Sequence, residues 1–336
     1  MKKLRIAQIG VGHDHAGPTM ATLRLCSDIF ELVGYARVPE DRKQDSSHKP
    51  MFEGVRELTL DELWAQKLDA VAIETEDENL TKYALLALRK GLAVQMDKPG
   101  SQDRETFREL IDYAKAHHSV LHFGYMYRYN AALLEAERLI RSGEVGEVLC
   151  IEAQMNCIHK EKKRNWLAGY KGGMMYFLGC HLIDVVLRLQ GEPKNILALN
   201  RVSGLGGAAG EDIGTAVFEY DRGVSVIRST AVEYNGFMRR QFIICCEKAT
   251  IEINPTEYYP TDDKYGEMFS DLRISYADEH GMDWMVRPPA KRYGPVDRYE
   301  AMFREFAAIA RGERESPWSL DYELLLHETI LRACGA

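Results

Sequence analysis

The feature that most constrains the fold is a regular alternation of short apolar runs and helical segments over the first 123 residues. The apolar runs, which predict strands, cover residues 4–9, 32–36, 70–73, 92–96 and 120–123. Helices are predicted between them, over residues 18–26, from a capping box at Thr59 onward, and over 80–90 and 105–116. This alternation is typical of a parallel sheet with helices on its faces, which binds ligands beyond the carboxyl ends of its strands.

The rhythm changes after Gly124. Helices are expected over residues 131–141, 177–189, 297–310 and 320–333, and strands over 148–157, 213–220, 224–230, 241–246 and 250–253. Short turns join the later strands in pairs, which predicts an antiparallel sheet, and residues 255–295 are interpreted as rich in loops. We therefore predict an α/β protein with two domains, residues 1–123 and 124–336, whose C-terminal helices can pack back on the first domain.

Composition and charge exclude several classes of function. The 51 acidic residues outnumber the 43 Lys and Arg, giving a net charge of -8, whereas nucleic-acid binders carry a basic surplus. No apolar run reaches the length of a membrane span, and the N-terminus lacks the long apolar stretch of a signal peptide, so a cytoplasmic protein is expected. The seven scattered cysteines form no C-x-x-C pair and are expected to be reduced thiols.

A glycine turn follows the first predicted strand and precedes the first predicted helix. It reads Gly10-Val11-Gly12-His13-Asp14-His15, with His15 where G-x-G-x-x-G has its third glycine. Backbone N–H groups at such a turn bind pyrophosphate, so we expect a nucleotide here; the alternative is a tight turn without a ligand. The two histidines and Asp14 are also residue types that coordinate metals. Ligands from a single turn rarely complete a tetrahedral coordination sphere, however, so no metal is predicted.

Two further motifs carry candidate chemistry. Asp97-Lys98-Pro99 ends the fourth long strand, where a lysine reaches the ligand crevice and can donate to a substrate hydroxyl; the alternative is a solvated surface lysine. His181 and Asp184 lie three residues apart on one face of a predicted helix. Alone, such a histidine is more often structural than catalytic.

In this order, the motifs resemble those of the Gfo/Idh/MocA family, named after glucose-fructose oxidoreductase, inositol dehydrogenase and rhizopine catabolism. The resemblance runs over nearly the whole chain and rests on the glycine turn, Asp97-Lys98-Pro99, the Gly124–Tyr129 segment and the Gly172–Asp184 segment. It implies an N-terminal Rossmann domain, a C-terminal α/β domain built on an open, mainly antiparallel sheet, and a bound NAD or NADP. It also implies a homodimer or homotetramer.

The resemblance assigns candidate roles to individual residues. The catalytic candidates are Lys98, which would polarise a hydroxyl oxygen, and His181, which would take or give its proton. The candidates for cofactor binding are Gly10, Gly12, His13, His15, Arg37, Thr75, Asp97 and Lys98. The candidates for substrate binding are Tyr125, Arg128, Asn156, His159, Trp166 and Asp184. The implied activity is hydride transfer at a secondary hydroxyl or ketone of a sugar or cyclic polyol.

Three positions depart from the family pattern. Phe177 stands where relatives have an Asp four residues before the histidine. Arg37 replaces the acidic residue that holds the ribose of NAD, which favours NADP. Residues 74–78 carry four carboxylates, which either repel phosphates in the crevice or sit favourably at a helix N-terminus. Two alternatives therefore stay open: an enzyme that retains its dinucleotide for a net non-redox step, and a sugar-binding protein that has lost catalysis.

Overall fold

The computed structural model describes residues 2–41, 44–260, 267–277 and 287–336. The chain divides into two compact units. The first contains residues Met1–Tyr125 and Tyr299–His327, and the second contains Met126–Arg298 and Glu328–Ala336. All seven cysteines are free thiols. No helix of the described residues is both long and apolar enough to cross a membrane.

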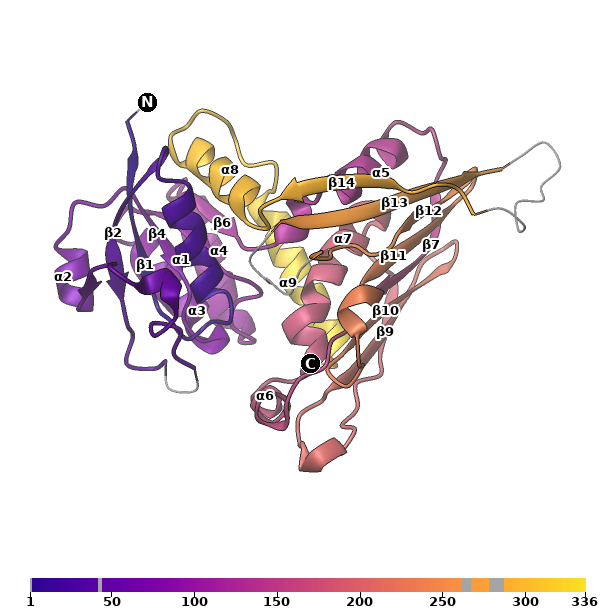
Figure 1. The fold of residues 1–336 in the computed structure, drawn as a ribbon, viewed down its shortest axis with the longest axis horizontal. Coiled ribbons are helices and arrows are strands. Elements are labelled where there is room, and N and C mark those ends of the chain that lie inside the picture. Colours follow the sequence, from indigo (N-terminus) through magenta and orange to yellow (C-terminus); the bar gives the residue numbers. More distant parts are fainter. Residues whose placement is uncertain (1, 42–43, 261–266, 278–286) are drawn as a thin grey trace. The chain divides into compact units, whose positions relative to one another are not determined.

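The first unit is built on a six-stranded parallel sheet of order β3-β2-β1-β4-β5-β6. Its strands are β1 (Leu4–Ile9), β2 (Phe30–Ala36), β3 (Glu57–Leu58), β4 (Ala70–Ile73), β5 (Ala93–Met96) and β6 (Leu121–Phe123). Its helices include α1 (Ala16–Leu25), α2 (Leu60–Trp64), α3 (Leu80–Leu88), α4 (Arg104–Ala116) and α8 (Glu300–Ala310) (Figure 1). This strand order is that of a dinucleotide-binding Rossmann sheet, so the predicted fold class is confirmed.

Local chemistry explains why the helices begin where they do. Thr59 and Glu62 form both hydrogen bonds of the predicted capping box at the start of α2. Asp103 caps α4 by accepting hydrogen bonds from the backbone N–H groups of Glu105 and Thr106. Strands β1 and β4, in the middle of the sheet, are almost wholly buried, as expected for a sheet covered on both faces.

The second unit contains an eight-stranded sheet of order β14-β13-β12-β11-β7-β10-β9-β8, in which only the β7–β10 pair is parallel. Its strands are β7 (Val148–Gln154), β8 (Asn195–Ala198), β9 (Ile213–Glu219), β10 (Val224–Thr230), β11 (Gln241–Cys246), β12 (Ala249–Ile253), β13 (Met268–Tyr276) and β14 (Lys291–Val296). Helices α5 (Ala131–Arg141) and α7 (Cys180–Gln190) pack against it, and the unit also contains α6 (Glu161–Trp166) (Figure 1). The final helix, α9, spans Leu320–Cys334.

The interpretation of residues 255–295 as loop-rich is wrong for two segments, because they form β13 and β14. In β13 the apolar pattern is broken by Ser270 and Asp271, which are nevertheless buried. The Ser270 hydroxyl donates to the Thr256 carbonyl oxygen, and Asp271 pairs with Arg292 of β14. β14 contains Pro295, which the sheet tolerates because this strand lies at its edge.

Candidate functional site

The glycine turn leaves β1 in a conformation that needs glycine. Gly10 has φ of +92°, and an added Cβ would lie 2.5 Å from the Thr75 backbone nitrogen. Thr75 therefore packs directly against the turn, where its hydroxyl donates to the Glu76 carbonyl oxygen. A side chain at residue 10 would push the turn away from the end of β4.

The backbone N–H groups of this turn hold an anionic oxygen. Those of Val11 and Gly12 donate to Asp41 Oδ2 at 2.8 and 3.0 Å, and that of Glu76 donates to Asp41 Oδ1 at 2.8 Å. Burial raises the pKa of Asp41 to about 6, against the lowering effect of these hydrogen bonds. Asp41 comes from the loop after β2, and nothing in the sequence around it indicated this contact.

The same N–H groups fit a dinucleotide phosphate. Amides that donate to a carboxylate also donate to a phosphate oxygen, and Gly12 leaves room for close approach, since a Cβ there would lie 2.5 Å from Asp41 Oδ1. The Asp41 carboxylate occupies the position that a phosphate bound to these amides would take, so a phosphate could bind there only after Asp41 had left.

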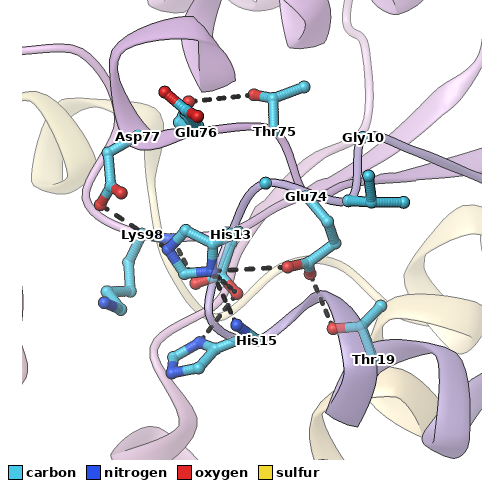
Figure 2. Close-up of polar contacts among 12 residues, drawn as sticks. Gly10, His13, His15, Thr19, Glu74, Thr75, Glu76, Asp77 and Lys98 are labelled. Carbon is cyan, nitrogen blue, oxygen red and sulfur yellow. Dashed lines mark hydrogen bonds and ion pairs between the residues drawn. The ribbon is translucent and has the colours of Figure 1, made fainter. Parts of the chain in front are cut away.

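His13 lies inside a group of buried carboxylates (Figure 2). Its Nδ1 is 3.2 Å from Asp97 Oδ2 and 3.5 Å from Glu74 Oε2, and its Nε2 is 3.6 Å from Asp77 Oδ1. His15 Nδ1 lies 2.9 Å from the same Asp97 oxygen. The carboxyl ends of β4 and β5 supply Glu74 and Asp97, so the sheet order brings together residues more than 60 positions apart.

Burial and these neighbours shift the pKa values in opposite directions. Burial lowers the pKa of His13, but Asp97 and Asp77 outweigh it and hold this pKa well above the usual value. Burial dominates at His15 and lowers its pKa to about 4. Burial also raises the pKa of Glu74, with a contribution from Asp97, whereas the two histidines overcome burial and keep the pKa of Asp97 well below its usual range.

The acidic run after β4 is mostly buried. Glu74, Glu76 and Asp77 are inaccessible, and only Glu78 of the four carboxylates is exposed. Glu74 and Asp77 face His13. Asp77 and Glu78 also lie in the first turn of a short 3-10 helix, Asp77–Asn79, so the expected placement at a helix N-terminus holds for these two and not for Glu74.

Lys98 is fully buried and follows β5 directly. Its backbone N–H donates to the Asp97 carboxylate at 2.6 Å. The alternative of a solvated surface lysine is therefore wrong. Tyr125, a predicted substrate-binding residue, is also buried and ends the first segment of this unit.

Arg37 follows β2, as predicted, and its guanidinium is already paired. It lies 2.8 Å from Asp45 and 2.9 Å from Glu57, and about half of each side chain is exposed. A 2′-phosphate would have to compete with these two carboxylates for the same guanidinium.

In the second unit, His181 is buried on α7 with the Tyr127 ring 5.6 Å away. Arg128 and Asp184, predicted to bind substrate, form a buried bidentate pair with hydrogen bonds of 2.7 to 3.2 Å. Arg188 lies 3.7 Å from the same carboxylate. Asp184 is thus held by arginines, which limits its freedom to bind a substrate.

Phe177, in place of the family's Asp, belongs to an aromatic group. Its ring centroid is 5.3 Å from that of Trp166 and 6.3 Å from that of His159, two predicted substrate-binding residues. The Lys163 ammonium lies 3.4 Å from the Trp166 centroid and 4.3 Å from that of Phe177. Asn156, another predicted substrate-binding residue, is buried, and its side-chain N–H donates to Gln154 Oε1 at 3.1 Å.

A six-stranded parallel sheet of this order, with an anion-holding glycine turn after β1, is the architecture of a Rossmann-like α/β fold. Residues 133–252 match the family model described as the GFO/IDH/MocA C-terminal domain. This match agrees with the resemblance to the Gfo/Idh/MocA family that the sequence motifs indicated.

Named relatives are oxidoreductases. An uncharacterized oxidoreductase of Schizosaccharomyces pombe is 30% identical over 158 residues, which are 46% of this chain and 43% of the relative. The scyllo-inositol 2-dehydrogenase (NADP(+)) of Bacillus subtilis is 25% identical over 164 residues, 47% and 44% of the two chains. These matches thus span less than half of either curated relative.

The fold also matches solved structures. The UDP-N-acetylglucosamine 3-dehydrogenase GnnA from Acidithiobacillus ferrooxidans superposes with a TM-score of 0.76 over 100% of this chain and 98% of that one, at 20% identity. At this identity the likeness concerns the fold.

Proposed function

We propose that this protein is an NAD(P)-dependent oxidoreductase that acts on a secondary hydroxyl or ketone of a sugar or cyclic polyol. The observation that carries the proposal is the glycine turn, whose Val11 and Gly12 amides hold an anionic oxygen at the carboxyl end of β1. The substrate class is supported by the relatives, which include an inositol dehydrogenase.

The dinucleotide would be held by the turn amides, with Arg37 positioned at the end of β2 for the adenosine ribose. NADP is favoured over NAD because a guanidinium pairs with a 2′-phosphate and cannot accept from ribose hydroxyls. That contact would require Asp45 and Glu57 to be displaced from Arg37. When bound, the nicotinamide supplies the hydride acceptor or donor.

Lys98 and His181 have separate proposed roles. The ammonium of Lys98 would donate to the reacting oxygen and stabilise its negative charge. His181 would take or give the hydroxyl proton, without the carboxylate that relatives place at the position of Phe177. Without a carboxylate at that position to orient the ring, proton transfer by His181 should be less efficient, so turnover slower than that of relatives is expected.

The test is a screen of sugars and cyclic polyols with NADP and NAD, monitored by nicotinamide absorbance. Lys98→Met and His181→Ala should each lower turnover by orders of magnitude and leave nucleotide affinity nearly unchanged. Near-normal turnover in either variant would remove that residue from the mechanism.

A second candidate, a sugar-binding protein that has lost its dinucleotide, is favoured by one observation. Asp41 occupies the turn amides with three hydrogen bonds, and a carboxylate fixed there excludes phosphate. This candidate predicts sugar binding in the absence of any nucleotide affinity. Calorimetric titrations with sugars and with nucleotides separate the two.

A further inference from the structure

The contacts around His13 are mostly too long for hydrogen bonds. Hydrogen bonds from N–H to oxygen cluster between about 2.7 and 3.2 Å. Two of the three carboxylates around His13 lie at 3.5 and 3.6 Å from its ring nitrogens. Glu74 Oε2, which faces His13 Nδ1, has no hydrogen-bond partner among the described residues, although its side chain is buried. Such buried atoms are costly unless something else satisfies them.

We propose that His13, His15, Glu74 and Asp97 bind a divalent transition-metal ion of the Zn²⁺ type. The donors are the two Nδ1 atoms, Glu74 Oε2 and Asp97 Oδ2. Two imidazoles and two carboxylates form a donor set that suits Zn²⁺. The site goes beyond the proposed oxidoreductase function and does not depend on it.

Two of the distances between donor atoms are close to those of tetrahedral coordination. Bond lengths of about 2.0 to 2.2 Å place the donors of a tetrahedral zinc ion about 3.3 to 3.6 Å apart. His13 Nδ1 lies 3.2 Å from Asp97 Oδ2 and 3.5 Å from Glu74 Oε2, close to that spacing. The contact from His15 Nδ1 to Asp97 Oδ2, 2.9 Å, would lengthen by about 0.5 Å on metal binding. Candidate donor atoms of His13, His15 and Asp97 lie within 4.8 Å of one another.

Neighbouring groups orient two of these donors. Asp77 lies beside His13 Nε2, where it can accept that N–H and leave the Nδ1 lone pair for the metal. The backbone N–H of His15 is 3.2 Å from His13 Nδ1 and would give up this contact to the ion. The Thr19 hydroxyl donates to Glu74 Oε1 at 2.7 Å, which turns Oε2 toward His13 (Figure 2).

The sequence predicted no metal because His13, Asp14 and His15 come from one turn. The fold changes that argument by adding Glu74 from the end of β4 and Asp97 from the end of β5. The donors then come from three chain segments. A divalent ion would also offset part of the negative charge of the buried carboxylates of Glu74, Asp77 and Asp97.

The test measures metal binding without nucleotide or substrate. The full chain, freed of any affinity tag and stripped with a chelator, is titrated calorimetrically with Zn²⁺, and metal content is measured by mass spectrometry after gel filtration. One tightly bound equivalent is expected. The Co²⁺-loaded protein should show the strong visible absorption of a tetrahedral site, a readout that needs no variant.

Variants then assign the ligands. His13→Gln and Glu74→Gln should each weaken Zn²⁺ binding at least a hundredfold, while His48→Gln, which changes an exposed histidine outside the cluster, should not. Circular dichroism checks that each variant is folded. No stoichiometric binding by the wild type, or unchanged binding in both cluster variants, would overturn the proposal and leave His13 as an imidazolium held by carboxylates. Since nucleotide binding is measured separately, failure here leaves the proposed function untouched.

Discussion

Asp41 should compete with the dinucleotide, and its removal should tighten nucleotide binding. Its carboxylate accepts three backbone hydrogen bonds, from Val11, Gly12 and Glu76, that a phosphate would have to replace. The turn can bind a nucleotide only when Asp41 has left it. The free energy needed to displace Asp41 therefore raises the apparent dissociation constant of the nucleotide. Asp41→Ala removes this cost.

The size of the effect follows from the hydrogen bonds. Each contributes about 1 kcal/mol net of water, so three contribute about 3 kcal/mol. Burial of the carboxylate, seen in its raised pKa of about 6, opposes this. If burial offsets about half of this free energy, roughly 1.4 kcal/mol remains to hold Asp41 in the turn. Its loss in Asp41→Ala corresponds to a nucleotide dissociation constant about tenfold lower.

The assay is calorimetric titration of NADPH into wild type, Asp41→Ala and Glu40→Gln. Glu40→Gln is the matched control because it removes the same charge at the adjacent residue. The Glu40 carboxylate contacts Lys82 and Tyr83 rather than the glycine turn. Tighter binding is expected in Asp41→Ala alone. Unchanged or weaker binding in that variant would refute the view that Asp41 occupies the phosphate position.

Three other predictions concern pH and stability. If displacement from the turn returns the pKa of Asp41 from about 6 to its ordinary 3.8, nucleotide binding at pH 5.5 should release roughly 0.7 proton, and nucleotide affinity should rise with pH between about 4 and 6. Calorimetry in buffers of different ionisation enthalpy measures the proton release. Equal proton release by Asp41→Ala would contradict this prediction. Arg128→Ala should lower the free energy of unfolding by about 3 kcal/mol because it removes the bidentate partner of the buried Asp184 carboxylate and leaves the more distant Arg188, whereas Arg138→Ala, at an exposed pair, should cost under about 1 kcal/mol. Similar denaturation midpoints would contradict the assigned burial. Gly91→Ala should lower the free energy of unfolding by about 1 kcal/mol, and Gly10→Ala should lower it by more. Both glycines have positive φ, but only a side chain at residue 10 would meet the Thr75 backbone. Equal shifts in melting temperature would argue against the close approach.

The sequence predicted the parallel sheet well, for a physical reason. Strands such as Leu4–Ile9 and Ala70–Ile73 are buried on both faces and therefore appear as continuous apolar runs. Helix starts such as Thr59 are encoded locally by a capping box. Strand β14 was missed because an edge strand needs no apolar alternation and tolerates its Gly294 and Pro295.

The site was predicted only in part. Alternation of strands and helices predicts that chain segments after β1, β4 and β5 meet at one edge of the sheet, so the region around Gly10 and Lys98 was found. Which side chains pair there depends on three-dimensional packing. The approach of Glu74 and Asp97 to His13 spans more than 60 residues, and Asp41 lies in a loop without a motif.

The most direct test of the account is to identify the nucleotide. Purified protein is denatured, any released nucleotide is identified by mass spectrometry, and the nucleotide-free protein is titrated with NAD, NADH, NADP and NADPH. One oxidised and reduced pair should bind, with NADP and NADPH preferred through Arg37. If neither the wild type nor Asp41→Ala binds any of the four, the dehydrogenase proposal is contradicted, and the sugar-binding alternative takes its place.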